Sequence, residues 1–224
     1  SRTYPAELAR SLNEFYREKG VEVLAGSTVK GCESRAGRSI LKVRDAKTGT
    51  EREIVADGVV AGVGVQPNVE LAQAAGVTVN NGIRVDASLL TNHPDVYAAG
   101  DVANIYNHSL NEWRRVEHED CANSMGGHAG IAMAGHTVSY DYLPFFYSDI
   151  FELGYEAVGE VDSRLEMVSD WKIPYKEGVV YYLRDGRVRG VLRGNMEGRV
   201  GGAKRLIAAA TSIRPGDPEG RLPT

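Results

Sequence analysis

The chain has 224 residues, 42% of them hydrophobic, and a formal net charge of −4 at pH 7. This composition is that of a folded globular chain, and it lacks the excess of positive charge that favours a nucleic-acid partner. No apolar run approaches the roughly 18 residues that span a bilayer, and the N-terminus lacks a basic-then-apolar signal pattern. We therefore expect a cytoplasmic protein with no nucleic-acid partner and no membrane span.

The first quarter of the chain predicts one helix followed by short strands. Apolar residues at Leu8, Leu12 and Phe15 lie on one helical face, and Gly20 is a suitable residue to end that helix. Turn residues then separate short β-type segments, which we expect to be antiparallel. A run of small residues follows and predicts one further strand. The strands are expected at residues 21–24, 27–33, 39–44, 51–56 and 57–64.

The next part of the chain predicts a short helix and two strands. Asn68 is a suitable N-cap for a helix that ends at Gly76, and alternating residues over 82–89 predict a strand. The small and β-branched residues 96–99 predict a buried strand that ends in Gly100 and Asp101. Open α/β sheets bind ligands at this edge, where a carboxylate accepts hydrogen bonds from sugar-like hydroxyls.

The remainder predicts a closely packed helix and an antiparallel sheet. Residues 117–135 are rich in Ala, Gly and Met, with acids at the start, as in a helix that packs tightly. Two strand-like segments, 179–184 and 187–193, flank Asp185-Gly186, the strongest signal for a two-residue hairpin turn. We expect this hairpin at the centre of an antiparallel sheet, with a helix over residues 201–210 after it.

The two cysteines, Cys32 and Cys121, are far apart in the sequence. They form neither a disulfide framework nor a Cys-x-x-Cys redox pair. We expect a structural or incidental role for both, with the reactivity of Cys121 an open question.

Five segments occur in the order found in FAD-dependent pyridine nucleotide reductases, and the resemblance that they carry covers about nine tenths of the chain. The sequence therefore resembles the pyridine nucleotide-disulfide oxidoreductase superfamily, in particular its apoptosis-inducing-factor-like and ferredoxin reductase branches. The segments are Val63–Asn68, Gly82–Asp86, Gly100–Asp101, Arg115–His118, and Tyr147–Asp149 with Gly154–Ala157.

The resemblance implies an α/β fold made of partial FAD- and NAD(P)-binding Rossmann-like domains, followed by an α+β C-terminal domain with an antiparallel sheet. It divides the chain at 1–65 (part of an NAD(P)H-binding domain), 66–143 (half of an FAD-binding domain) and 144–224 (an interface or dimerisation domain). The chain lacks the Gly-x-Gly-x-x-Gly fingerprint of dinucleotide-binding folds. We therefore expect a C-terminal portion of a longer reductase whose N-terminal half completes both domains.

The resemblance also assigns binding residues for FAD and NAD(P)H, but no catalytic acid or base and no metal ligand. Asp101 on the Gly100 turn would hold the ribityl chain, and the helix at His118 would face the flavin ring with Glu117. Glu119 stands where relatives carry an aromatic residue or histidine, and a carboxylate there would oppose flavin reduction unless it is paired. Tyr147 would lie against the flavin, while Gly64 and Glu156 would contact the nicotinamide.

The implied function is hydride transfer from nicotinamide to flavin, with electrons passed on to an acceptor such as ferredoxin, in a homodimer. This fragment alone is expected to be inactive. Two alternatives stay open at this point: a disulfide reductase of the same superfamily, and a non-catalytic fragment that acts as a dimerisation or interaction module. The hairpin arginines suggest a docking surface for an acidic partner or, alternatively, a solvated strand face: Arg184, Arg187, Arg189 and Arg193.

Overall fold

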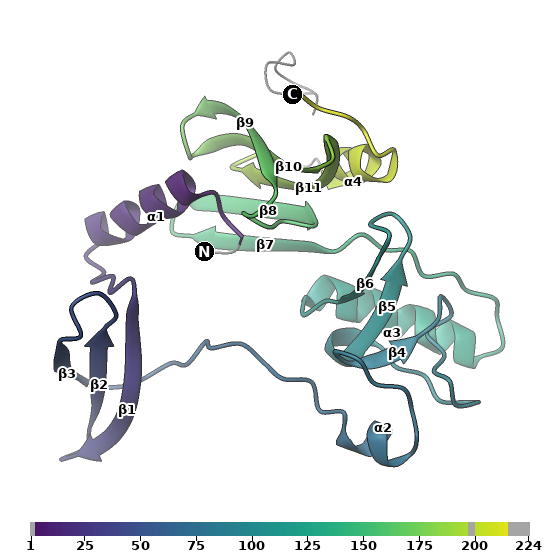
Figure 1. Ribbon diagram of the computed structural model, residues 1–224, viewed down its shortest axis with the longest axis horizontal. Helices are drawn as coiled ribbons and strands as arrows, with labels where there is room; N and C mark the ends of the chain where they lie inside the picture. The colour runs from purple at the N-terminus through teal and green to yellow at the C-terminus, as the bar shows by residue number, and fades with distance from the viewer. Residues whose placement is uncertain (1–2, 197–199, 215–224) are drawn as a thin grey trace. The chain divides into compact units, whose positions relative to one another are not determined.

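The computed structural model describes residues 3–196 and 200–214, which form two compact units (Figure 1). Arg10–Gln66 make up the smaller unit, and the chain before Arg10 and after Gln66 makes up the larger one. Within these described residues, no helix is long and apolar enough to cross a membrane. The division of the chain into 1–65, 66–143 and 144–224 stays a prediction.

The smaller unit is built on a three-stranded antiparallel sheet. The sheet has the order β1-β2-β3, with β1 at Ser27–Arg35, β2 at Arg38–Asp45 and β3 at Glu51–Ala56. The predicted helix is α1 (Ala6–Glu18), which begins in the larger unit and continues into the smaller one. These four elements confirm the sequence-based prediction of a helix followed by short antiparallel strands.

Two of the predicted strands, 21–24 and 57–64, are wrong: neither segment pairs with a strand of the described chain. The second was predicted because small and β-branched residues suit a strand buried on both faces, yet Val60 is 100% exposed and Val63 is 91% exposed. A strand of this kind is stable only between partner strands, because its backbone N–H and C=O groups need a ladder.

The first part of the larger unit packs one long helix against a small mixed sheet. The sheet has the order β4-β5-β6, parallel between β4 and β5 and antiparallel between β5 and β6. Met125 and Ala129 of the helix join Val85 and Ile105 of the sheet in one buried cluster. The elements are α2 (Glu70–Ala74), β4 (Ile83–Val85), η1 (Gly100–Val102), β5 (Ala103–Asn107), β6 (Glu112–Arg115) and α3 (Glu119–Met133).

Three predictions for this part need correction. The N-cap of α2 is Val69 rather than Asn68, and no side chain caps it. The strand predicted over 82–89 ends at Val85, because the Asp86 carboxylate accepts backbone N–H groups of Ser88 and Leu90 in a local turn. Residues 96–99 form only an isolated bridge, since no neighbouring strand of the described chain pairs with them along their length.

The last part of the larger unit is a five-stranded antiparallel sheet covered by α4 (Val200–Ala208), as Figure 1 shows. The predicted hairpin turn is confirmed, because Asp185 and Gly186 both have positive φ angles, 53° and 72°. Ala203 and Ile207 bury the inner face of α4 against the sheet. The strand order is β7 (Phe145–Ile150), β8 (Leu153–Gly159), β11 (Arg187–Gly194), β10 (Glu177–Arg184) and β9 (Glu166–Ile173).

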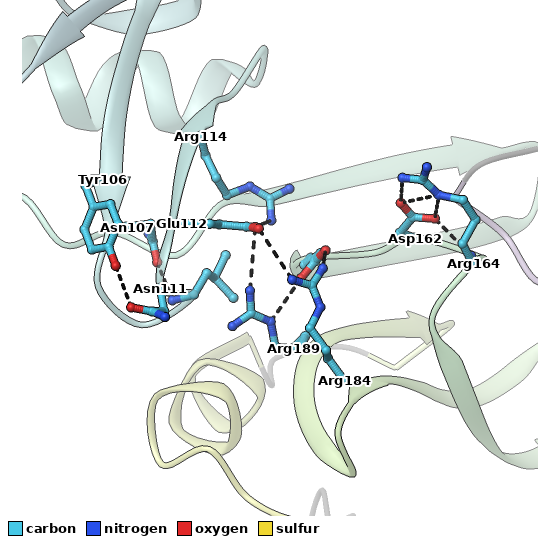
Figure 2. Close-up of polar contacts among 11 residues, drawn as sticks. Tyr106, Asn107, Asn111, Glu112, Arg114, Asp162, Arg164, Arg184 and Arg189 are labelled. Atoms are coloured by element: carbon cyan, nitrogen blue, oxygen red, sulfur yellow. Dashed lines mark hydrogen bonds and ion pairs between the residues drawn. The ribbon is translucent and has the colours of Figure 1, made fainter. Parts of the chain in front are cut away.

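An ion-pair network joins the β10–β11 hairpin to β6, and Figure 2 shows most of its members. Arg184 and Arg189 both bind Glu160, at 2.5 and 3.0 Å, and Arg189 also lies 3.7 Å from Glu112 of β6. Arg193 is buried and bound to Glu156. The predicted common surface of hairpin arginines is therefore wrong for Arg189 and Arg193, whose side chains are 14% and 0% exposed and bind carboxylates of their own chain, whereas Arg184 is exposed.

Replacing Glu160 by Gln is expected to destabilise the larger unit. The Glu160 side chain is 10% exposed and faces two guanidinium groups, so its neutral analogue leaves two positive charges close together, and that of Arg189 is only 14% exposed. Removing one partner of a buried pair costs about 3 kcal/mol of the free energy of unfolding, which urea titration measures.

The control variant is Glu166→Gln, which makes the same change at an exposed position of β9. It should alter the free energy of unfolding by less than about 0.5 kcal/mol. Equal effects of the two variants would contradict a structural role for the network.

Candidate functional site

A hollow of about 590 Å³ opens at the amino end of α3, within the larger unit. The two elements that form it are the first turn of α3 with the residues before it, and the first half of β7. Four sequence-predicted site residues lie together in its lining, which consists of Glu117, His118, Glu119, Asp120, Asn123, Phe145, Phe146 and Tyr147.

His118 is the N-cap residue of α3 and lies between the helix and β7. Its ring centroid is 4.9 Å from that of Phe146, and its buried Nδ1 has no hydrogen-bond partner among the described residues. Burial lowers the pKa of His118 below 6.5, and the nearby Arg114 lowers it further. The imidazole is therefore neutral at pH 7, with one ring nitrogen available to a ligand.

The first turn of α3 presents backbone N–H groups toward the hollow. The earliest bond inside the helix runs from the N–H of Ala122 to the carbonyl of His118, at 3.0 Å, and the His118 side chain does not cap the helix. The preceding N–H groups have no acceptor within the helix, and the aligned peptide dipoles place partial positive charge here. This end of α3 suits an electron-rich oxygen or an anion.

Two acidic side chains also lie at this helix end, with different surroundings. Glu119 is exposed, so water screens its charge. Asp120 is half-buried and accepts a hydrogen bond of 2.5 Å from the Tyr142 hydroxyl. The ammonium of Lys204 lies 3.7 Å from the centroid of the Tyr142 ring and offsets the Asp120 charge.

The Gly100 turn packs directly against α3. Gly100 has φ +75°, and a methyl group there would lie 3.5 Å from the Cβ of Ala122. On the other side of the turn, a methyl group at Gly82 would lie 2.5 Å from the carbonyl oxygen of Val102, so only glycine fits at that position. The turn is thus held between β4 and the start of α3.

The side chain of Asp101 is exposed at the end of this turn. It does not line the hollow, but its charge acts on His118 and opposes the lowering of that pKa. Arg115 donates a hydrogen bond of 3.0 Å to the Asp101 carbonyl and binds the Glu117 carboxylate at 2.7 Å. This arginine connects the turn with the edge of the hollow.

The remaining predicted residues lie in different places. Tyr147 is 65% exposed in the hollow, and Glu156 lies directly opposite it on β8, bound to Arg193 rather than lining the hollow. Gly64 belongs to the smaller unit, with φ +93° in a segment without regular structure, and its assignment stays a prediction.

Sequence reasoning missed two residues that orient this site, Arg115 and Arg193. Arg115 was noted only as part of a motif, and Arg193 was assigned to an exterior surface. The positions of their partners could not be deduced from the sequence, because Arg115 binds a turn and Arg193 binds a neighbouring strand. The signal that could have indicated a buried ion pair for Arg193 is its position directly after the apolar residues Val191 and Leu192.

The open question about Cys121 is answered by its surroundings. The thiol is buried, at 3% exposure, and burial raises its pKa to about 11. A thiol in this environment is protonated at neutral pH and therefore unreactive. Among the described residues, no group of three or more metal-ligating side chains occurs.

The fold is that of the Rossmann-like α/β class to which FAD- and NAD(P)-binding oxidoreductases belong. The chain belongs to the pyridine nucleotide-disulphide oxidoreductase family, whose sequence pattern matches residues 1–135. Proteins of this family use FAD and NAD(P)H, and the resemblance seen in the sequence is confirmed.

Two characterised relatives are similar over almost the whole chain. Monodehydroascorbate reductase 3 of Arabidopsis thaliana is 34% identical over 221 residues, which cover 96% of this chain and 49% of the relative. The mitochondrial apoptosis-inducing factor 1 of Dictyostelium discoideum is 34% identical over 229 residues, with 95% and 42% covered. The chain thus spans about half the length of these relatives.

Solved structures agree with this assignment. The ferredoxin reductase of Rhodopseudomonas palustris superimposes with a TM-score of 0.81 at 24% identity, covering 95% of this chain and 52% of that one. The reductase in the covalent putidaredoxin reductase–putidaredoxin complex superimposes with a TM-score of 0.78 at 27% identity, covering 93% and 50%. The predicted fold class, partial nucleotide-binding domains followed by an antiparallel C-terminal sheet, is confirmed.

A pH titration is expected to give His118 a midpoint below pH 6.5, because the folded surroundings disfavour the imidazolium. The free energy of unfolding should also depend on pH. Below about pH 6.5 the unfolded chain binds a proton at His118 that the folded chain does not yet bind, so stability falls as the pH falls from about 6.5 to the folded midpoint. The imidazole C–H resonance measures the midpoint, and His118→Gln assigns it by removing the signal. A midpoint at or above 6.5 would contradict burial of the ring.

Proposed function

We propose that this chain supplies the C-terminal, flavin-facing part of an FAD-dependent NAD(P)H oxidoreductase that passes electrons to an iron–sulfur ferredoxin. The observation that carries the proposal is the hollow at the start of α3, where a helix amino end, a neutral histidine and an exposed aromatic side chain converge. Such a combination offers one positive pole, one hydrogen-bonding nitrogen and one flat apolar surface to a planar ring.

The residues present fit the flavin in this hollow. The buried, unpartnered Nδ1 of His118 and the N–H groups of the first turn of α3 are suited to the polar edge of the ring. Tyr147 is suited to one face of the ring, and the Asp101 carboxylate would accept hydrogen bonds from the ribityl hydroxyls. The bound flavin would supply the hydride-accepting centre of the reaction.

The protein groups tune this chemistry through charge. Reduction places negative charge on the ring, and a helix amino end stabilises an adjacent anion by about 0.3–1 kcal/mol when exposed and by up to about 2 kcal/mol when partly buried. Glu117 and Asp120 oppose this effect, but Arg115 and Lys204 lie close to them and offset their charges. The helix end therefore adds a positive contribution to the local field, and the exposed Glu119 adds a screened negative one.

The nicotinamide is expected beside Tyr147 and Glu156, on the strand pair β7–β8. The two residues lie directly opposite each other in the antiparallel register, so their side chains project from the same face of the sheet. A partly exposed carboxylate accepts the amide N–H groups of a nicotinamide. The assignment of Gly64 to the nicotinamide is part of the same proposal, because its positive φ angle allows close backbone contact with a ligand.

The acceptor is inferred from relatives, and the whole reaction needs the half of the protein that the relatives contain beyond this chain. One similar structure is that of putidaredoxin reductase bound covalently to putidaredoxin, which supports a ferredoxin-type partner. The rival interpretation, a disulfide reductase, requires a redox cysteine pair outside this chain. Steady-state turnover of a ferredoxin, and not of a disulfide, by the complete protein is the expected result.

The substitution Asp101→Asn is expected to weaken FAD binding about 10- to 100-fold in the complete protein. A hydrogen bond to a charged acceptor contributes about 1.5–3 kcal/mol, and the amide that replaces the carboxylate is a weaker acceptor. Flavin fluorescence during titration of the apoprotein measures the dissociation constant.

Asp95→Asn is the matched control, because Asp95 is also exposed and its φ of 64° is one that Asn tolerates. Its flavin affinity should equal that of the unmodified protein. A complete protein that binds no FAD, or one whose bound flavin NAD(P)H does not reduce, would refute the proposed function.

A further inference from the structure

Three side chains form a row across the C-terminal sheet, starting at the hollow. Tyr147 on β7 lies opposite Glu156 on β8, and Glu156 lies opposite Arg193 on β11. Directly opposed residues of antiparallel strands project from the same face. The row therefore leads from the wall of the hollow into the interior beneath α4, where Val158 and Val191 of the same two strands are buried.

Arg193 is the most deeply buried charged side chain of the row. Its side chain is 0% exposed, whereas that of Glu156 is 30% exposed. One guanidinium nitrogen donates to the Glu156 carboxylate at 2.9 Å, and the other terminal nitrogen donates to the carbonyl of Met196. The guanidinium is thus held at two points, and its orientation fixes one oxygen of Glu156.

Stability alone does not account for an arginine at this position. Its neighbour across β10 is Val179, and the surrounding cluster is apolar, so an aliphatic side chain would pack there without desolvating a charge. Buried ion pairs are often no more stabilising than apolar residues of similar volume. The arrangement instead resembles an orienting pair, in which a fixed buried cation keeps a partly exposed carboxylate ionised and in place.

We infer that Arg193 is a positioning residue that holds Glu156 as an ionised hydrogen-bond acceptor for the carboxamide of the nicotinamide, next to Tyr147. This inference rests on the proposed function. It adds a specificity determinant: the site prefers a pyridine ring whose substituent donates N–H groups. Without Arg193, the carboxylate loses its anchor and turns away or takes up a proton, and a protonated carboxyl no longer offers the same acceptor.

The experiment compares NADH with acetylpyridine adenine dinucleotide in its reduced form, in the complete protein with FAD bound. The acetyl group of the analogue accepts hydrogen bonds but donates none, so it cannot use an ionised Glu156. The two dinucleotides react with free flavin at intrinsically different rates, and this ratio is the reference. For flavin reduction by the unmodified protein, we expect the ratio of kcat/KM for NADH to that for the analogue to exceed the reference by about 10- to 100-fold, which is the excess preference for NADH.

The diagnostic variant is Arg193→Met, which removes the charge and keeps the length of the side chain. Its excess preference for NADH should fall to near one, mainly through a higher KM for NADH, while the analogue is affected little. Arg193→Lys, which restores a positive charge, should recover part of the preference. Arg205→Met, at an exposed position of α4, is the control and should behave as the unmodified protein.

A double variant keeps the test decisive if Arg193→Met folds poorly. Arg193→Met combined with Glu156→Gln removes both charges, so no buried ion is left without a partner. It should show the same loss of preference as Glu156→Gln alone, because Arg193 acts only through Glu156.

An unchanged preference in a folded Arg193→Met protein, or equal losses with both dinucleotides, would overturn the inference while leaving the proposed function intact. Failure of NADH to reduce the flavin of the unmodified protein would instead refute the proposed function itself, and the inference with it. Flavin absorbance and circular dichroism establish that each variant is folded and loaded.

Discussion

The close packing of the Gly100 turn against α3 determines where the other groups of the site lie. The turn reaches the helix because Gly100 has no side chain and Ala122 has only a methyl group. Gly82 supports the turn from behind, at a distance that no Cβ atom tolerates. A steric constraint on the backbone therefore places the Asp101 carboxylate beside the start of the helix, and the electrostatics of the site depend on it.

Charge in the larger unit is arranged in pairs that are sheltered to different degrees. Arg115 binds Glu117 near the surface, whereas Arg193 binds Glu156 from a fully buried position. Water reaches the carboxylate of both pairs, at 37% and 30% exposure, but it reaches the guanidinium only in the first pair, at 11% against 0%. The carboxylates of Glu117 and Glu156 are thus partly exposed, where a ligand can reach them, and their arginine partners are more deeply buried. A buried arginine of this kind can fix the orientation of a carboxylate near the surface.

Local signals in the sequence were sufficient for much of the fold. The Asp185-Gly186 turn and the small-residue helix α3 were predicted correctly, because each depends on the conformational preferences of neighbouring residues. The strands predicted at 57–64 and 96–99 failed for a physical reason: strand formation needs a partner, and composition does not reveal whether one is present. β9 was missed because its charged and polar residues mask the alternation of an edge strand.

In the candidate site, too, residues that are neighbours in the sequence were predicted, and contacts between distant segments were not. Glu117, His118 and Glu119 are consecutive, so their proximity follows from the sequence, and the structure adds Tyr147 to the same hollow. The partners of the hairpin arginines come from β6 and β8 and from the segment that follows β8, and no local pattern indicates such pairs. Charge on a strand therefore suggested an exterior surface, where the structure buries Arg189 and Arg193 in ion pairs.

The valine-rich segment after Asp57 has a consequence for the behaviour of the chain in solution. Residues 58–66 contain no charged residue, and Val60 and Val63 lie almost wholly in water. Extended, uncharged backbone with β-branched side chains is a template for strand addition from a second molecule. We therefore expect this polypeptide to self-associate as its concentration rises. A single lysine in this segment should suppress that association.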